Sequence, residues 1–159
     1  MIVVSDTSSI SNLLIIGEVH LLRLLFASVV VPDAVYDELC RIPAHKNELQ
    51  HLDWIERRKL TDIRLFNRLQ DELDKGESEA IALAIELKAD LLLIDESLGR
   101  EVAESLGLNI TGILGVLIRA KDAGYIPEVR QLINKLIDEA DFWIGAKTIS
   151  AALQLAGEE

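Results

Sequence analysis

The sequence lacks the features of a disulfide-bonded, zinc-binding or membrane protein. Cys40 is its single cysteine, so no internal disulfide can form and no cysteine cluster is available to hold zinc. No apolar run reaches the ~18 residues that a membrane-spanning helix needs, and the N-terminus has neither the basic start nor the cleavage site of a signal peptide. These absences predict a cytoplasmic protein that has no membrane partner.

Aromatic residues and positive charges are also scarce. Aromatic residues make up 4% of the chain and hydrophobic residues 50%, so the core must be built from Leu, Ile, Val and Ala. The 16 Lys and Arg against 27 Asp and Glu give a net charge of −11, which argues against a broad basic surface for nucleic acid and fits a site rich in carboxylates. A local basic cluster, Arg57 to Lys59, is either a nucleic-acid contact or a solvated helix face.

Apolar runs alternate with helical patterns along the whole chain. Four runs predict buried strands, and each is separated from the next by one to three helices: 2–4, 28–31, 91–94 and 108–110. We therefore expect one domain over residues 1–159, of the α/β class, with a parallel sheet of about four strands and helices on both faces. Residues 56–62 are either a short edge strand or an exposed helix, residues 43–50 a loop or the start of a surface helix, and Gly76 is expected to interrupt the helical pattern.

Four acidic residues occupy unusual places in this pattern. Asp6 and Asp95 each follow a buried strand, at the sheet edge where ligands bind in open α/β sheets. Glu38 falls on the apolar face of a predicted helix, and Glu77 lies in the first turn of another. Taken singly, each has a simpler explanation, since Asp6 can cap a helix and Glu77 can favour the helix dipole. Together they predict one crevice in which the carboxylates lie about a metal-bridged distance of ~4 Å from a common centre.

Clustered carboxylates must be neutralised by protons or by cations. Hard oxygen ligands select Mg²⁺ or Mn²⁺ rather than zinc. Such ions suit the hydrolysis of a phosphodiester, because they orient the phosphate and stabilise the leaving oxygen.

At these residues the sequence resembles the PIN-domain ribonucleases, the family of the VapC toxins, and in particular a PIN-like branch long catalogued as a domain of unknown function. Asp6, Thr7 and Ser8 match the opening D-[ST]-[SN] signature of that family. The segment PDAVYDEL matches its proline-led helix and gives Glu38 as the second acid, whereas LLLIDES gives Asp95 as the fourth. The segment GESEAIALA aligns with its Ala-Leu-Ala pattern and gives Glu77 as the third acid, with Glu79 as a competing choice.

The resemblance implies a PIN-like three-layer fold and a metal-dependent endoribonuclease, the toxin of a type II toxin–antitoxin pair. It implies Mg²⁺ or Mn²⁺ as cofactor, RNA as substrate, a cognate antitoxin as a protein partner, and a homodimer. The catalytic and metal-binding residues would be Asp6, Glu38, Glu77 and Asp95, with Thr7, Ser8, Glu79, Glu96 and Arg100 as possible accessory residues. Arg100 either contacts a phosphate or forms a salt bridge with Glu96 or Glu104, which lie within helical reach.

Two departures from the family pattern favour an alternative. Glu77 stands where most relatives have Asp, and Leu93 stands where many have a hydroxyl residue two positions before the fourth acid. A catalytically weakened PIN-fold protein that acts by binding is therefore the second hypothesis. A phosphatase or phosphoacceptor domain is the third, although the strand at 108–110 is followed by Thr111 and Gly112 rather than by the lysine that it needs.

The first helices carry more aliphatic residues than one buried stripe requires. Those residues are Ile10, Leu13, Leu14, Leu22 and Leu25. We expect them to form an apolar dimer interface away from the acidic crevice, and the alternative is that they pack under the sheet.

Overall fold

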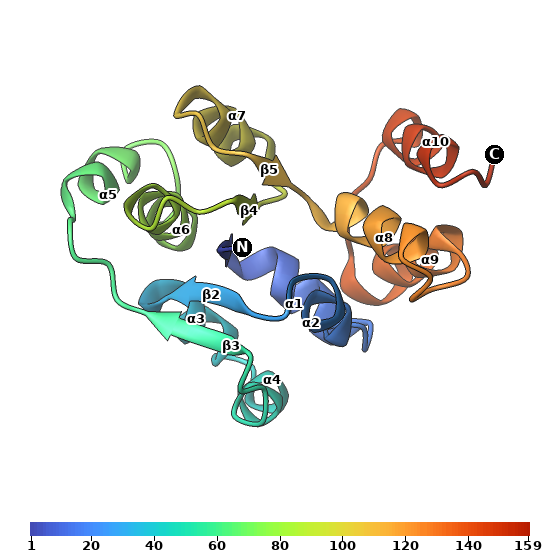
Figure 1. Cartoon of the computed structure of the whole chain (residues 1–159), viewed down its shortest axis with the longest axis horizontal. Coiled ribbons are helices and arrows are strands. Elements are labelled where there is room, and N and C mark those ends of the chain that lie inside the picture. The colour runs from blue at the N-terminus through green and yellow to red at the C-terminus, as the bar shows by residue number, and fades with distance from the viewer.

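A parallel sheet of five strands forms the centre of the computed structural model, which describes all residues from 1 to 159. Figure 1 shows the sheet with helices around it. The strand order is β3-β2-β1-β4-β5. The strands are β1 (Val3–Ser5), β2 (Val29–Pro32), β3 (Ile55–Arg58), β4 (Leu91–Leu93) and β5 (Ile110–Thr111). Every neighbouring pair is parallel, so all five strands end at the same edge of the sheet. The α/β prediction is confirmed.

Ten helices connect and flank the strands. They are α1 (Thr7–Ile15), α2 (His20–Phe26), α3 (Asp33–Leu39), α4 (Pro43–Leu49), α5 (Arg64–Leu69), α6 (Lys75–Glu86), α7 (Ser97–Ser105), α8 (Ile113–Asp122), α9 (Val129–Ala140) and α10 (Ala146–Leu155). The connections from β1 through β2 to β3 run along the sheet in one direction, and those from β3 through β4 to β5 run in the other. Because such crossovers share one hand, α1 to α4 cover one face and α5 to α7 cover the opposite face.

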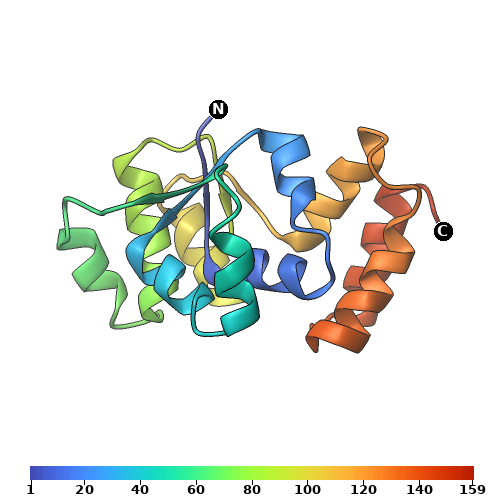
Figure 2. The ribbon, with the colours of Figure 1, turned by 90° about the horizontal axis from the view of Figure 1, so that it is seen from below.

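The last three helices form a separate group beside the sheet. Figures 1 and 2 both show α8, α9 and α10 together at the C-terminal end of the molecule, where α8 contacts α2 and α9 contacts α1. No helix of the chain is long and apolar enough to span a lipid bilayer.

Two segments that the sequence left open are resolved by the structure. Residues 55–58 form the edge strand β3, which pairs with β2 and raises the strand number from the expected four to five. Its three exposed residues, Glu56 to Arg58, are charged, and charges on an edge strand discourage pairing with other chains. Residues 43–49 form α4, which begins at Pro43 with the ring in the first helical turn, where proline is well tolerated.

The prediction that Gly76 interrupts a helix is wrong. Gly76 lies inside α6, close to its start, and its backbone is helical. A Cβ atom at this position would lie 2.7 Å from Glu38 Oε1. Glycine here leaves the Glu38 carboxylate its space, which a side chain would take, and it does not mark the end of a helix.

The predicted dimer interface is also wrong. Ile10, Leu13, Leu14 and Leu22 are buried in the core of the single chain, and Leu25 is half-buried and packs against that core. These helices lie between the sheet and the α8 to α10 group, so both of their sides are covered. Their aliphatic excess serves folding of the monomer, which was the alternative explanation.

Candidate active site

Asp6 follows β1 directly and is buried at the start of α1. Its Oδ1 accepts the backbone N–H of Ser9 at 3.1 Å, and its Oδ2 accepts the Ser8 hydroxyl at 3.2 Å. Asp6 therefore caps α1, as the simpler explanation has it. The same side chain also lines an acidic cleft, so capping and a place in the candidate site coexist.

Ser9 joins Asp6 to Asp95. The Ser9 backbone binds Asp6, and the Ser9 hydroxyl donates to Asp95 Oδ2 at 2.9 Å. Burial and the negative charge of Asp95 raise the pKa of Asp6 to about 7, although the hydrogen bonds from Ser9 and Ser8 oppose the rise. Burial also raises the pKa of Asp95, against the hydrogen bond that its Oδ1 accepts from the backbone of Ile113 at 2.8 Å. Holding two negative charges at the buried Asp6 and the half-buried Asp95 is therefore unfavourable.

Glu38 reaches the cleft from α3. Thr7 donates its hydroxyl to Glu38 Oε2 at 2.6 Å, which fixes the carboxylate beside the start of α1. The other wall is Gly76 of α6, where the absence of a side chain leaves room for both Glu38 oxygens.

Glu77 reaches the cleft from the first turn of α6. Asp74 caps this helix by accepting the Glu77 backbone N–H at 2.8 Å. The Glu77 side chain is buried, and its Oε2 has no hydrogen-bond partner. Desolvation, a hydrogen bond with Glu96 and the charge of Asp74 raise the pKa of Glu77 to about 8. An unpaired buried carboxylate oxygen needs either a proton or a cation beside it.

Asp74, Glu77 and Glu96 form the tightest acidic cluster of the chain. Each offers one carboxylate oxygen, and these oxygens lie within 4.8 Å of one another. The sequence had placed Glu96 only among accessory residues and had missed Asp74. The signal that could have found Asp74 is the D-x-x-E spacing of Asp74 and Glu77, which is typical of a helix start.

One polar cleft of about 440 Å³ collects most of the predicted residues, and no hydrophobic side chain lines it. Its lining consists of Asp6, Thr7, Ser8, Ser11, Asn12, Glu38, Asp74, Glu77 and Glu96. Asp95 does not line this cleft. It contacts the cleft only through Ser9 and borders a second, larger cavity. Three of the four predicted acids, Asp6, Glu38 and Glu77, therefore line one cleft, and the fourth, Asp95, lies outside it.

Two accessory residues lie elsewhere. Glu79 Oε1 accepts the backbone N–H of Ala34 at 3.1 Å, so this side chain caps the start of α3 and does not line the cleft. Of the two candidates for the third acid, Glu77 alone lines it. Arg100 forms no salt bridge with Glu96 or Glu104; its Nη1 donates to the carbonyl of Ile94 at 2.8 Å, beside the larger cavity.

The donor set of the cleft fits a divalent cation. All the ligand atoms are carboxylate or hydroxyl oxygens, which Mg²⁺ and Mn²⁺ prefer. Glu77 Oε2 is the orphaned atom that such an ion would satisfy, and a Cβ at Gly99 would lie 2.6 Å from it, so glycine there leaves this oxygen its space.

Comparison with known families agrees with this arrangement. A family profile described as "PIN domain" matches residues 2–158. PIN domains are generally nucleases and usually bind divalent metals, so the acidic cleft has the character expected of a nuclease site. No curated protein matches the chain.

Proposed function

We propose, since this chain belongs to the PIN-domain family, that it is an endoribonuclease that depends on Mg²⁺ or Mn²⁺. The observation that carries the proposal is the cluster of carboxylate oxygens from Asp74, Glu77 and Glu96 in a wholly polar cleft, in which Glu77 is buried and its Oε2 has no hydrogen-bond partner. A buried, charged carboxylate with an unpaired oxygen is unfavourable unless a cation lies beside it. Groups with such perturbed pKa values cluster at functional sites.

The proposed ligands are Glu77, Asp74 and Glu96, together with Asp6 and Glu38, which line the same cleft. A bound divalent ion would polarise the phosphodiester and neutralise the charge that develops on its oxygens. In the metal-free chain the pKa of Asp6 is raised to about 7, so near neutral pH a bound cation would displace a proton from this carboxyl. Thr7 holds Glu38, and Ser9 holds both Asp6 and Asp95, so these hydroxyls fix the acids before substrate arrives.

Ser9 also bears on the alternative of a catalytically weakened protein. That alternative rests partly on Leu93, which removes a hydroxyl that many relatives have near the fourth acid. Here the Ser9 hydroxyl, which belongs to α1, donates to Asp95 at 2.9 Å and so supplies a hydroxyl beside the fourth acid. This hydrogen bond supports an active enzyme over a binding protein.

The proposal extends to the biological role that the family resemblance implies. The chain is the toxin of a toxin–antitoxin pair, acts on cellular RNA in the cytoplasm, and is held inactive by a cognate antitoxin. It is also a homodimer, with an interface that lies outside the buried helix residues first assigned to it. Light scattering tests the dimer: particles of 17.7 kDa at micromolar concentration would end that part of the proposal.

Two glutamates of α6 provide the test of the activity. Glu77 and Glu79 lie on the same helix and are both buried, but only Glu77 lines the cleft. Cleavage of a fluorescent single-stranded RNA by the purified protein should require Mn²⁺ or Mg²⁺ and stop in EDTA. Glu77→Gln should abolish this cleavage, whereas Glu79→Gln, the matched control, should cleave as the wild type does. Asp6→Asn and Asp95→Asn should also lose cleavage while remaining folded. Wild-type turnover by Glu77→Gln would end the proposal.

A further inference from the structure

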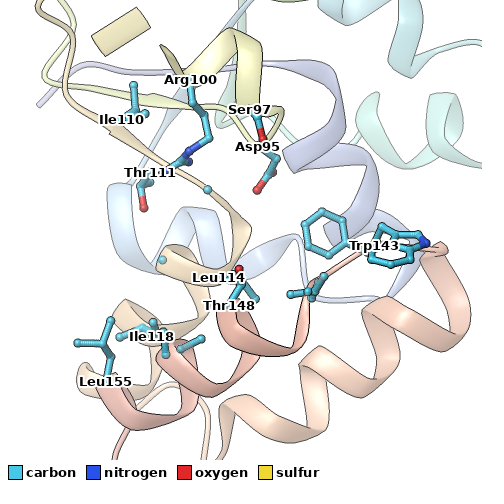
Figure 3. A pocket seen from close by; sticks show the side chains of 17 residues that line it. Asp95, Ser97, Arg100, Ile110, Thr111, Leu114, Ile118, Trp143, Thr148 and Leu155 are labelled. Carbon is cyan, nitrogen blue, oxygen red and sulfur yellow. The ribbon is translucent and has the colours of Figure 1, made fainter.

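A second cavity adjoins the candidate site on the far side of Asp95. It has a volume of about 620 Å³ and lies between β5, α8 and α10 (Figure 3). This volume is within the range of ~300–1,000 Å³ that is usual for small-molecule pockets. Asp95 borders the cavity and reaches the acidic cleft through the Ser9 hydroxyl, so a molecule in this cavity would lie next to the proposed site of cleavage.

The cavity has one cation, Arg100, which lies near Asp95 and whose charge lowers the pKa of that carboxyl against the larger effect of burial, although the two form no salt bridge. Arg100 extends into it from α7, as Figure 3 shows, and forms no salt bridge with any acid of the chain. One hydrogen bond, to the Ile94 carbonyl, holds its Nη1. A guanidinium has five N–H donors, so most of them remain free. A free, half-buried guanidinium is suited to a phosphate group.

Gly112 keeps this corner of the cavity open. A Cβ at position 112 would lie 2.6 Å from Asp95 Oδ1 and 3.1 Å from Arg100 Nη1. The backbone of Gly112 thus passes directly beside both charged groups, and no side chain separates Arg100 from the cavity.

The rim of the cavity carries an exposed indole. Trp143 lies in the segment between α9 and α10 and is 91% exposed, whereas the other tryptophan of the chain, Trp54, is 8% exposed. An indole left in water gains nothing for the fold, because burial is what makes a large apolar side chain stabilising. Such a ring is suited to stacking on a planar ligand. Leu114 and Ile118 are among the apolar side chains that line the cavity.

We propose that this cavity is a nucleotide subsite, in which Trp143 stacks on a base and Arg100 binds a phosphate of the same single-stranded RNA. The inference rests on the proposed ribonuclease function and deepens it, since it assigns the groups that hold the strand beside the cleavage site. Aromatic stacking combined with a positive charge is how proteins hold single-stranded nucleic acid. This arrangement would allow a protein with a net charge of −11 to bind RNA without a broad basic surface, because a single cation in a recess can bind a phosphate.

The main rival occupant is a second copy of the chain. A flat protein surface would not reach Arg100 inside the recess. We therefore favour a nucleotide, and self-association becomes an outcome of the test.

The two tryptophans make the test direct. The full chain, labelled with ¹⁵N, gives one indole N–H signal from Trp143 and one from Trp54, and the buried Trp54 serves as internal reference. Titration with adenosine 5′-monophosphate in EDTA should shift the Trp143 signal and leave the Trp54 signal in place. Ribose 5-phosphate, which has the phosphate without the base, should bind more weakly by about tenfold.

Variants separate the two contacts. Trp143→Ala should weaken binding of the nucleotide by about tenfold and leave binding of ribose 5-phosphate unchanged, and Trp143→Phe should restore most of the affinity. Arg100→Gln should weaken binding of both ligands. Tyr125→Ala and Arg119→Gln, an exposed aromatic residue and an exposed cation outside the cavity, are the matched controls and should bind as the wild type does.

The outcomes distinguish this inference from the proposed function. Equal affinity for the two ligands, or unchanged affinity in Trp143→Ala, would overturn the subsite even if the protein cleaves RNA. Nucleotide binding that depends on Trp143 would support the subsite even if no cleavage is found. A Trp143→Ala variant that changes the oligomeric state and not the nucleotide affinity would assign this face to a second copy and overturn the subsite.

Discussion

Gly76 of α6 and Glu38 of α3 are in contact across the cleft wall, so that a Cβ on Gly76 would lie 2.7 Å from Glu38 Oε1 and 3.0 Å from Oε2. The contact places a glycine inside a helix, where it is ordinarily unfavourable by roughly 0.5–1 kcal/mol relative to alanine. In return it lets a carboxylate approach the first turn of α6, close to Glu77. Gly76 thus makes α6 less stable than alanine would, and it leaves room for the Glu38 carboxylate in the acidic cleft.

The effect of Gly76→Ala on the free energy of unfolding should change sign with the residue at position 38. In the wild-type chain the new methyl group displaces Glu38 and breaks its bond to Thr7, so we expect a loss of ~1–3 kcal/mol in the free energy of unfolding and loss of cleavage. In a Glu38→Ala background the same change should add ~0.5–1 kcal/mol. Urea unfolding of the four proteins measures both effects. A loss of similar size in the two backgrounds would show that Glu38 is not the group that requires glycine.

The stability of the metal-free protein should fall as pH rises through the titration of Asp6. The pKa of Asp6 is raised to about 7 in the folded chain, so between pH ~4 and ~7 the folded state retains a proton that the unfolded state has released. Each step upward in that window therefore lowers the free energy of unfolding, by roughly a few kcal/mol in total. Asp6→Asn should remove this part of the slope and melt at a higher temperature than the wild type at pH ~8.

Melts in EDTA across that window test the expectation. Asp62→Asn is the control: the bonds from Arg64 lower the pKa of Asp62 to about 2, so this variant should keep the wild-type slope above pH ~4. Wild-type and Asp6→Asn curves that run parallel would contradict the assignment of a raised pKa to Asp6.

Binding of a divalent ion should release a proton from Glu77. The pKa of this carboxyl is raised to about 8, so near pH 7 it is mostly protonated and must lose that proton to become a ligand. Calorimetric titration with Mn²⁺ in two buffers of different ionisation enthalpy gives the number of protons released, which we expect to approach one. Affinity should rise between pH ~6 and ~8. Glu77→Gln should bind weakly and release fewer protons than the wild type, and Glu79→Gln should match the wild type.

The C-terminus should contribute to stability through Glu158. Its carboxylate accepts the backbone N–H of Val129 at 2.7 Å and that of Arg130 at 3.0 Å, which caps the start of α9, and Lys121 lies 3.0 Å away. Glu158→Ala should therefore lower the free energy of unfolding by ~0.5–2 kcal/mol, the usual range for loss of a helix cap. Glu159→Ala, which removes only an exposed bond to Ser150, is the control and should change stability less. Equal losses of stability in the two variants, measured by urea unfolding, would show that Glu158 does not act as the cap of α9.

Much of the fold was predictable because it depends on local patterns. The β-branched and leucine runs identified β1, β2 and β4, and the alternation with helical periods gave a parallel sheet. The short strand β3 was left open because three of its four residues are charged and exposed, and only pairing with β2 makes it a strand. The excess of aliphatic residues in α1 was misjudged for a similar reason, since the sequence shows how apolar a helix is but not how many neighbours cover it.

For the candidate site, the sequence by itself determined that Asp6 ends a strand, that Glu77 begins a helix and that Glu38 lies on the apolar face of another, and the structure has all three lining one cleft. Only the tertiary structure decided that Glu77 rather than Glu79 lines the cleft, that Asp74 and Glu96 join it, and that Asp95 borders the cavity with Arg100 and Trp143. The physical reason is that a side chain's period along its own element fixes the direction in which it points. The distance between carboxylates on different elements is instead set by how those elements pack, down to a single missing Cβ at Gly76.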